Sequence, residues 1–325
     1  MGHVGRWPRV SAKSNLPEGF NELTRRVLRE SSFAKNTLPR KSSLVWDDFT
    51  YFAFLDFNRT DAQANYLYEL FEKGDLLDQS TILRLGTRWA QKARSHASVR
   101  LARLGIGRKR QTLSEMSGGQ LDEANRTLVE AAHFFRDNSV TPEFLRRNTT
   151  DLNLTNDLIM RVCYPDREKN PRHIHRFGLT KFILFLNDYG LALNYCPPSR
   201  QVLSFVEREL MHRIRPSLLS EDQELVENWA DLFIAIGKMR SLAQTLTTTL
   251  SVGVTTADVG HTIWLYKSTQ NLLAFSRLRP RLTPRKFLAF VDASGWELSD
   301  LTSRLTDIDE VDGLAEELRD FLVQH

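Results

Sequence analysis

The chain of 325 residues has only two cysteines, Cys163 and Cys196, and they lie far apart in no CxxC pair. Disulfide frameworks and structural zinc sites need more cysteines at closer spacing, so both are excluded. The chain also lacks an apolar run of about 20 residues that could span a bilayer, because its most apolar stretch, 182–195, is interrupted by Asn187 and Asp188. We therefore expect no membrane partner and a cytoplasmic protein, nucleoid-associated if bacterial.

The first six residues lack the apolar core of a secretory signal peptide, and a short basic leader of the organellar type stays open. Glycine and proline are sparse, with 16 and 11 residues, which excludes collagen-like and low-complexity chains. Runs of alternating β-branched residues are few, whereas apolar residues recur at intervals of three and four. The sequence predicts an all-α fold. Helices are expected over 61–71, with Thr60 as N-cap, and over 80–104, 120–136, 142–148, 154–163, 179–189, 199–213, 221–238, 240–250, 255–274, 284–293 and 311–323.

Charge is unevenly distributed, although the net charge is only +4. Residues 84–110 carry nine basic side chains and no acidic one, whereas 292–320 carry ten acids and two arginines. Dense basic stripes are typical of polyanion binding, because each neutralised phosphate releases counterions. The alternative is a solvated helix face. Within the stripe Arg84, Arg88 and Lys92 fall on one face of the expected helix, where they would follow a nucleic-acid backbone.

These shifts in composition predict three parts. Residues 1–42 form a basic, partly disordered N-terminal segment, 43–275 form the helical domain, and 276–325 form an acidic C-terminal extension with helices of its own. We expect the extension to bind a protein partner or to mimic DNA.

The most informative stretch is 172–190, where a polar turn at Gly178 leads directly into an amphipathic helix. The amides at a helix N-terminus and the helix dipole both favour an anion, so this turn is a candidate phosphate site. Phe177 would anchor the turn in the core or lean on the nucleic acid. No metal is expected, because His173 and His175 with Cys163 lack a second ligand pair. The candidate DNA-binding residues of this region are Arg172, His173, His175, Arg176, Phe177, Gly178, Leu179, Thr180 and Arg200.

Here the sequence resembles the helix-hairpin-helix DNA glycosylases, especially the archaeal-type 8-oxoguanine glycosylase/DNA lyase branch. The resemblance covers about residues 45–270 in scattered pieces. It implies a two-lobed all-α fold with a cleft near 172–203, binding to double-stranded DNA, and no cofactor. The pieces that carry it are Phe177-Gly178-Leu179, Phe185-Leu186 with Gly190, Ser199-Arg200-Gln201-Val202-Leu203, the helix 121–136 and the closing helices 227–267.

Both catalytic positions depart from the family pattern. The resemblance places the family's Schiff-base lysine on Thr180, with Lys181 one residue later, and its aspartate on Ser199. An amine nucleophile needs a lowered lysine pKa, and a carboxylate must stabilise the positive charge that develops on the sugar. Lys181 would be that amine, a phosphate contact or a solvated residue. The candidates for the catalytic set are Lys181, Asp188 and Ser199, with Asp231 and Asp258 as weaker carboxylates.

Two functions follow from these observations. The first is a DNA glycosylase, a hydrolase of N-glycosyl bonds with or without lyase activity, that flips a damaged or modified base into its cleft for DNA repair or antiviral defence. The second is a non-catalytic helical scaffold whose basic stripes bind DNA, RNA or an acidic protein surface.

Overall fold

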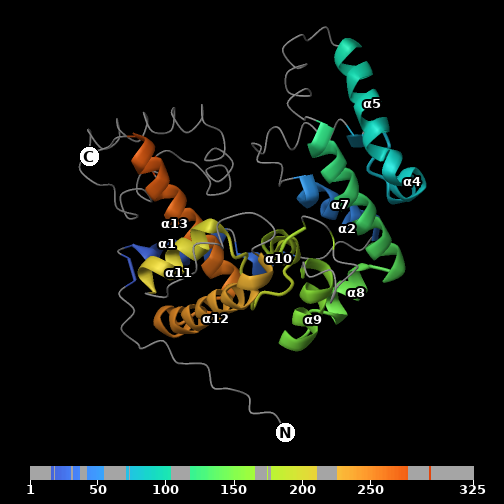
Figure 1. The fold of residues 1–325 in the computed structure, drawn as a ribbon. Helices are drawn as coiled ribbons and strands as arrows, with labels where there is room; N and C mark the ends of the chain where they lie inside the picture. The colour runs from blue at the N-terminus through green and yellow to red at the C-terminus, as the bar shows by residue number, and fades with distance from the viewer. Residues whose placement is uncertain are drawn as a thin grey trace. The chain divides into compact units, whose positions relative to one another are not determined.

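All regular structure in the described part of the chain is helical, and no strand occurs there. The all-α prediction is therefore confirmed, whereas the helix-hairpin-helix arrangement stays a proposal. The computed structural model describes residues 16–17, 19–30, 32–36, 42–54, 71–72, 74–103, 118–164, 174, 177–210, 225–276 and 293. Its helices are α1 (Phe20–Glu30), η1 (Phe33–Lys35), α2 (Ser42–Phe54), α4 (Gln79–Leu85), η2 (Gly86–Arg88), α5 (Trp89–Arg103), α7 (Gly118–Asp137), α8 (Pro142–Arg147), α9 (Leu152–Cys163), α10 (Leu179–Asp188), α11 (Arg200–Glu209), α12 (Leu225–Leu250) and α13 (Thr256–Ser276) (Figure 1).

Two of the predicted helices begin at side-chain caps. Thr141 and Asp151 accept hydrogen bonds from the first turns of α8 and α9, as N-cap residues do. The start of α8 at Pro142 is as predicted, whereas α9 begins two residues before the predicted start at 154. One prediction was wrong: the helices expected over 221–238 and 240–250 are not separated, because α12 runs from Leu225 to Leu250 through Met239, a good helix former. None of the described helices is both long and apolar enough to cross a membrane. The predicted helices over 61–71, 284–293 and 311–323, with the Thr60 cap, lie almost wholly outside the described residues.

The chain divides into two compact units, one formed by Met1–Asn36 with Leu193–His325 and the other by Thr37–Ala192. These units change at residues 36/37 and 192/193, whereas the predicted domain boundaries lie at 42/43 and 275/276. The predicted domains stay a prediction. The division into two units places α1, inside the segment predicted to be only partly ordered, with α11, α12 and α13. The two units are described separately below.

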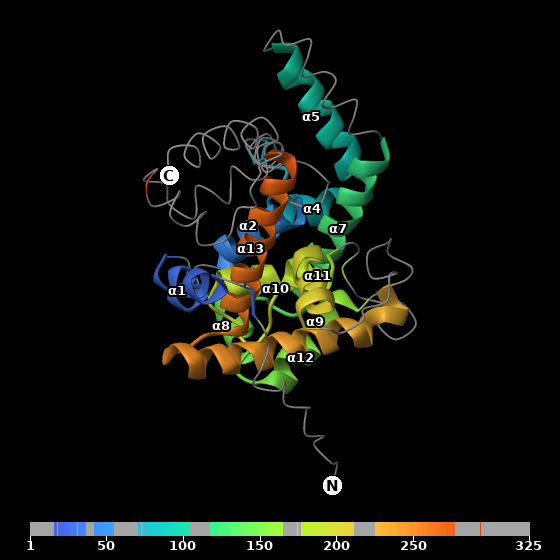
Figure 2. The same cartoon turned by 90° about the vertical axis from the view of Figure 1, so that its left-hand side faces the viewer.

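In the first unit α13 contacts α1, α11 and α12. Figures 1 and 2 show α13 rising steeply from α12. Phe20 of α1 stacks on Phe205 of α11 at 5.3 Å and meets Tyr266 of α13 edge-on at 5.9 Å. Gly260 permits a close approach, because a Cβ there would lie only 2.6 Å from the Cβ of Cys196. Burial of these aromatic rings joins the four helices into one core.

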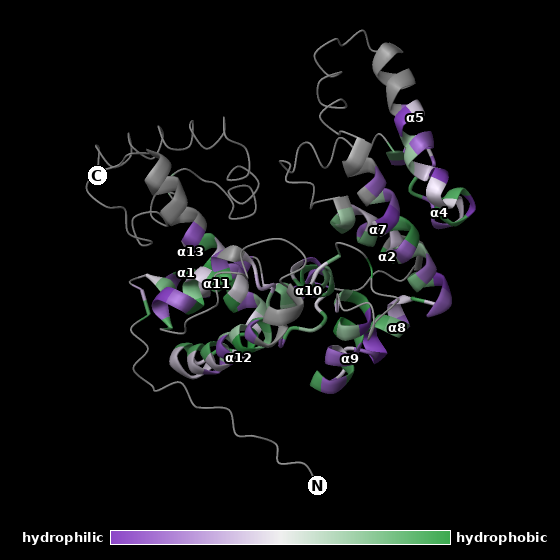
Figure 3. Ribbon diagram, viewed as in Figure 1, coloured by the Kyte–Doolittle hydropathy of each residue, from purple (hydrophilic) through white to green (hydrophobic). Residues whose placement is uncertain are grey.

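In the second unit aromatic residues of α2, α7 and α10 form the core. Phe49 is its centre, with ring centroids 4.8 Å from Phe135 and 5.3 Å from Phe185. Two tryptophans, Trp46 and Trp89, donate from their indole nitrogens to the carbonyls of the loop before α4, both at 2.7 Å. Green and purple residues alternate along α7 and α9 in Figure 3, as expected for helices with one buried side.

Candidate functional site

The predicted turn at Gly178 is present in the second unit, and α10 begins directly after it. Gly178 is the N-cap of α10, with extended backbone angles (φ −72°, ψ 173°), and its carbonyl accepts from the amide of Phe182 at 3.1 Å. Because glycine has no side chain, no hydroxyl or carboxylate of the N-cap residue occupies the helix start. A Cβ built on Gly178 would meet no atom within 4 Å. The start of α10 is therefore open at this position.

The residues on either side of Gly178 are fixed in the core. The Phe177 ring is 0% exposed and stacks on the Phe49 ring with centroids 4.1 Å apart. The Phe177 amide donates to the carbonyl of Ile174, whose own amide donates to the carbonyl of Val162 of α9. Leu179 is buried as well. Of the predicted DNA-binding residues, Phe177 and Leu179 therefore offer a ligand only their backbone.

Lys181 lies in the first turn of α10, close to the turn that precedes it. Its ammonium nitrogen is 5.8 Å from the centroid of the Phe177 ring, within the range of a cation–π contact. Its charge also acts on Cys163 of α9, where burial raises the pKa of the thiol well above its usual range and Lys181 opposes that rise. Lys181 and Thr180 are partly exposed. A positive charge is thus fixed beside the open helix start.

Asp188, the candidate carboxylate, lies at the opposite end of α10. Seven residues of helix separate it from Lys181, about 10 Å along the axis. Its side chain is exposed, yet partial desolvation and then the Asp48 carboxylate raise its pKa. Asp48 of α2 accepts a hydrogen bond from the Tyr189 hydroxyl. Burial and the nearby carboxylates also raise the pKa of Asp47. Three carboxylates therefore gather at the C-terminal end of α10.

This acidic cluster is not a candidate metal site within the described part of the chain. Among the described residues, no three His, Cys, Asp or Glu side chains are grouped so that they could hold a metal ion. The Tyr189 hydroxyl donates to Asp48, and burial together with that hydrogen bond raises the pKa of Tyr189. The arrangement leaves Asp188 with a carboxylate that binds a proton more readily than an ordinary aspartate.

Ser199 belongs to the other unit, where it is the N-cap of α11. Its hydroxyl accepts from the amide of Val202 at 3.3 Å, the ordinary structural use of serine at this position. Arg200 is the first residue of α11, and Asp231 is a partly exposed residue of α12. The structure therefore puts Ser199 and Lys181 on different units.

Asp258, the other weaker carboxylate, is engaged entirely in structural hydrogen bonds. It is fully buried at the start of α13, where Oδ2 accepts from the amide and hydroxyl of Thr255 at 3.1 and 2.6 Å. Oδ1 accepts from the amide of Phe33 in η1 at 3.2 Å. The amide of Asp258 in turn donates to the Thr255 hydroxyl. This capping box explains the aspartate, and the Thr-x-x-Asp spacing could have revealed it.

A buried lysine that the sequence did not single out lies in the first unit. Lys267 of α13 is 6% exposed, and its ammonium nitrogen is 3.7 Å from Oε1 of Glu209 in α11. Desolvation lowers the pKa of Lys267, and the attraction to Glu209 only partly offsets that effect. No sequence pattern marks this pair, because the two residues meet only when α11 packs against α13.

The basic stripe differs from its prediction in shape. The helix expected over 80–104 is interrupted, since α4 ends at Leu85 and Gly86 adopts φ 52°, a left-handed angle that favours glycine. Figures 1 and 2 show α4 and α5 running in different directions. The assignment of Arg84, Arg88 and Lys92 to one helix face was therefore wrong, because they lie on α4, η2 and α5. All three side chains are exposed.

Four candidate DNA-binding residues before Phe177 and most of the predicted acidic extension belong to the part of the chain that the structure does not describe. The four residues are Arg172, His173, His175 and Arg176, and the extension is described only at Ser276 and Ala293. No protein-family model, no curated protein and no solved structure matches the chain. The geometry at the start of α10 is therefore the basis for the proposed function.

Proposed function

We propose that the chain binds the sugar-phosphate backbone of DNA at the open turn before α10, in the manner of a DNA glycosylase. The observation that carries the proposal is the Gly178 N-cap, which has no side chain of its own to cap the helix and no atom within 4 Å of the place where a Cβ would stand. A phosphate group fits such a helix start, because the dipole and the first amides both favour an anion.

Two neighbouring features support the same ligand. Lys181 adds a positive charge in the first turn, and the buried Phe177 ring holds the turn in place before any ligand arrives. A rigid site loses little conformational entropy on binding. Exposed Arg84, Arg88 and Lys92 in the same unit would add contacts that are electrostatic and independent of base sequence.

The decisive variant is Gly178→Asp. An aspartate at the N-cap would accept from the first-turn amides and stabilise α10, while its negative charge would repel a phosphate. We expect affinity for a short duplex, measured by fluorescence anisotropy, to fall on the order of tenfold or more, since one favourable phosphate contact is replaced by repulsion. The free energy of unfolding should not decrease.

The matched control is Thr141→Asp at the N-cap of α8. Thr141 already accepts from the amide of Phe144 at 3.1 Å, so this change adds the same charge and keeps the cap. The control should bind DNA like the original chain. Equal affinity in all three proteins would reject the turn as a DNA contact, and an equal loss in both variants would attribute the effect to net charge alone.

Base excision is the further step of this proposal. Duplexes carrying oxidised, deaminated, alkylated or glycosylated bases, heated or treated with alkali after incubation, would show strand cleavage at one lesion. Borohydride trapping tests the amine, because an imine formed between lysine and the sugar aldehyde is reduced to a stable adduct. An adduct lost in Lys181→Ala assigns Lys181, whereas one lost only in Lys267→Met assigns the buried lysine of α13.

A non-catalytic DNA-binding scaffold is the second candidate. It is favoured by the structural use of two candidate groups, since Ser199 caps α11 and Asp258 caps α13. Binding that weakens steeply with salt, with no cleavage and no adduct on any of these duplexes, would favour the scaffold.

A further inference from the structure

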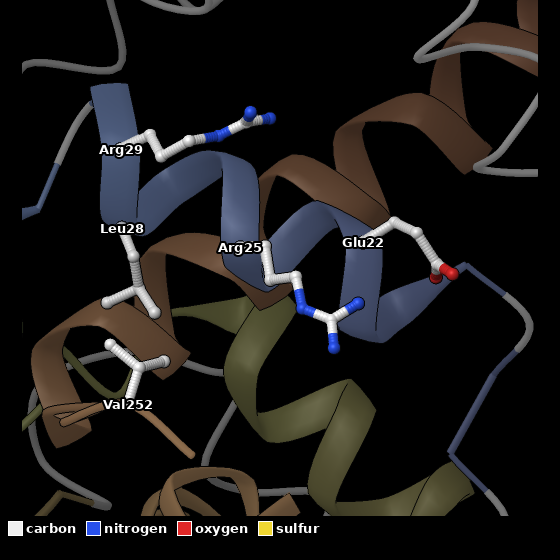
Figure 4. Close-up of a pocket in the computed structure, with 5 residues that line it drawn as sticks. All are labelled: Glu22, Arg25, Leu28, Arg29 and Val252. Carbon is white, nitrogen blue, oxygen red and sulfur yellow. The ribbon is translucent and has the colours of Figure 1, made fainter. Parts of the chain in front are cut away.

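The first unit has a groove that the proposed DNA contact does not use. It has a volume of about 480 Å³ and is lined by α1 and by the turn between α12 and α13. Figure 4 shows Leu28 and Val252 facing each other, with the charged side chains along α1 beside them. The lining residues are Glu22, Arg25, Leu28, Arg29 and Val252.

The charged side of the groove follows from the amphipathic pattern of α1. One side of the helix is buried, whereas Glu22, Arg25 and Arg29 on the other side are exposed. The buried residues are Phe20, Leu23, Thr24, Arg26 and Val27. Arg25 and Arg29 are one turn apart and both exposed, and neither guanidinium makes an ion pair within the described part of the chain. Two cations are therefore available to carboxylates of a bound segment.

The apolar side of the groove is also accessible to solvent. Val252, at the tip of the α12–α13 turn, is 44% exposed, and Leu28 is partly exposed. Burying such side chains is worth about 25 cal/mol per Å² of apolar surface removed from water. An occupant should therefore offer apolar side chains together with negative charge.

Residues 307–320 of the same chain have this chemistry. They contain seven acids, and Ile308, Val311, Leu314 and Leu318 recur at intervals of three and four. The segment lies outside the described residues. It is 31 residues beyond the end of α13, a length that can span on the order of 100 Å, so reach does not limit contact.

We infer that the groove binds the acidic segment 307–320 of the same molecule. Arg25 and Arg29 form ion pairs with its carboxylates, and the Glu22 carboxylate forms one with its Arg319. Leu28 and Val252 cover its apolar side chains. A nucleic-acid strand fits the groove less well, because its uniform negative charge meets the Glu22 carboxylate and its backbone offers little to the apolar wall. The groove thus engages a protein segment rather than the DNA of the proposed function.

Hydrogen–deuterium exchange on the full chain tests this assignment. In Arg25→Glu/Arg29→Glu, amides of 307–320 should exchange about tenfold faster than in the original chain, because loss of the charge pairs exposes the segment. Val252→Asp should have the same effect. The control Arg146→Glu/Arg147→Glu makes the same change of charge at exposed residues of α8 in the other unit, outside the proposed DNA contact, and should leave exchange unchanged.

Three results would overturn the inference. The first is equal exchange in 307–320 in all variants. The second is protection that disappears on dilution, which would assign the occupant to a second copy. The third is DNA affinity that falls in the groove variant, but not in its control, with exchange of the segment unchanged, which would assign the groove to nucleic acid. Urea unfolding of each variant confirms that the fold is retained, so faster exchange then reports release of the segment.

Discussion

At the start of α13, Thr255 and Asp258 satisfy each other's donors, and Asp258 also accepts from the amide of Phe33. At the start of α10, Gly178 provides no capping side chain, and the space around it is open. The first helix start is closed by its own side chains, whereas the second depends on the buried Phe177 behind it. Capping residues stabilise a helix but occupy the positions at which an anion would bind. The capped start of α13 therefore serves stability, whereas the start of α10 can serve binding.

The largest expected effect tests whether the aromatic core holds the α10 turn. Phe177→Ala removes a fully buried ring that stacks on Phe49, and it should cost about 4 kcal/mol of unfolding free energy through lost burial and the cavity left behind. Urea unfolding measures the loss. Phe144→Ala, at a partly buried ring of α8, is the control and should cost much less. Similar losses would mean that the turn has no special anchor.

The next effect tests the closed start of α13. Asp258→Ala leaves three donors without their acceptor and should destabilise the chain by about 3 kcal/mol. The control is Asp151→Ala, which removes an exposed N-cap carboxylate of α9 that accepts from two amides and should cost about 1 kcal/mol. If both substitutions cost the same in urea unfolding, the link to Phe33 contributes nothing.

A smaller effect compares the caps directly. Gly178→Ser supplies the missing acceptor and reduces the freedom of the unfolded chain, so it should stabilise by about 0.5 kcal/mol. Ser199→Gly removes the acceptor of Val202 and should destabilise by a few tenths of a kcal/mol, roughly the reverse change at α11. Thermal unfolding of both variants gives the signs. Destabilisation by Gly178→Ser would show that the space at Gly178 is needed by the fold itself.

The sequence was sufficient for features that local patterns encode. The apolar spacing after Gly178 predicts α10 correctly from Leu179, and Thr141 caps α8 directly before its predicted start at 142. The break at Gly86 escaped prediction, because a single glycine within a helical pattern is compatible with a continuous helix.

Features that depend on tertiary packing were beyond reach of the sequence. Lys267 and Glu209 are 58 positions apart and meet only through the contact of α11 with α13. The local Thr-x-x-Asp spacing indicates that Asp258 caps α13, but its acceptor role toward Phe33 joins residues 225 positions apart and has no local signal. The position of Ser199 and Lys181 on different units likewise follows from the division of the chain and from no motif.

The smallest effect distinguishes the two ends of α10 by pH. Desolvation and the Asp48 carboxylate raise the folded-state pKa of Asp188 above its ordinary value of 3.8. The folded protein therefore loses stability as pH rises from 3.8 through the raised pKa, because the partly desolvated carboxyl must then ionise. Asp188→Asn should therefore unfold at a higher temperature than the original chain near neutral pH, and the difference should shrink below about pH 3, where both side chains are neutral. Asp157→Asn, at an exposed carboxylate of α9 outside the acidic cluster, controls for the loss of one charge. A carboxylate that lowers stability is expected where function needs it. If Asp188→Asn is more stable and loses strand cleavage, Asp188 takes part in the reaction. Greater stability with unchanged DNA binding and no cleavage in either protein would leave Gly178 at the other end of α10 as the functional position of this helix.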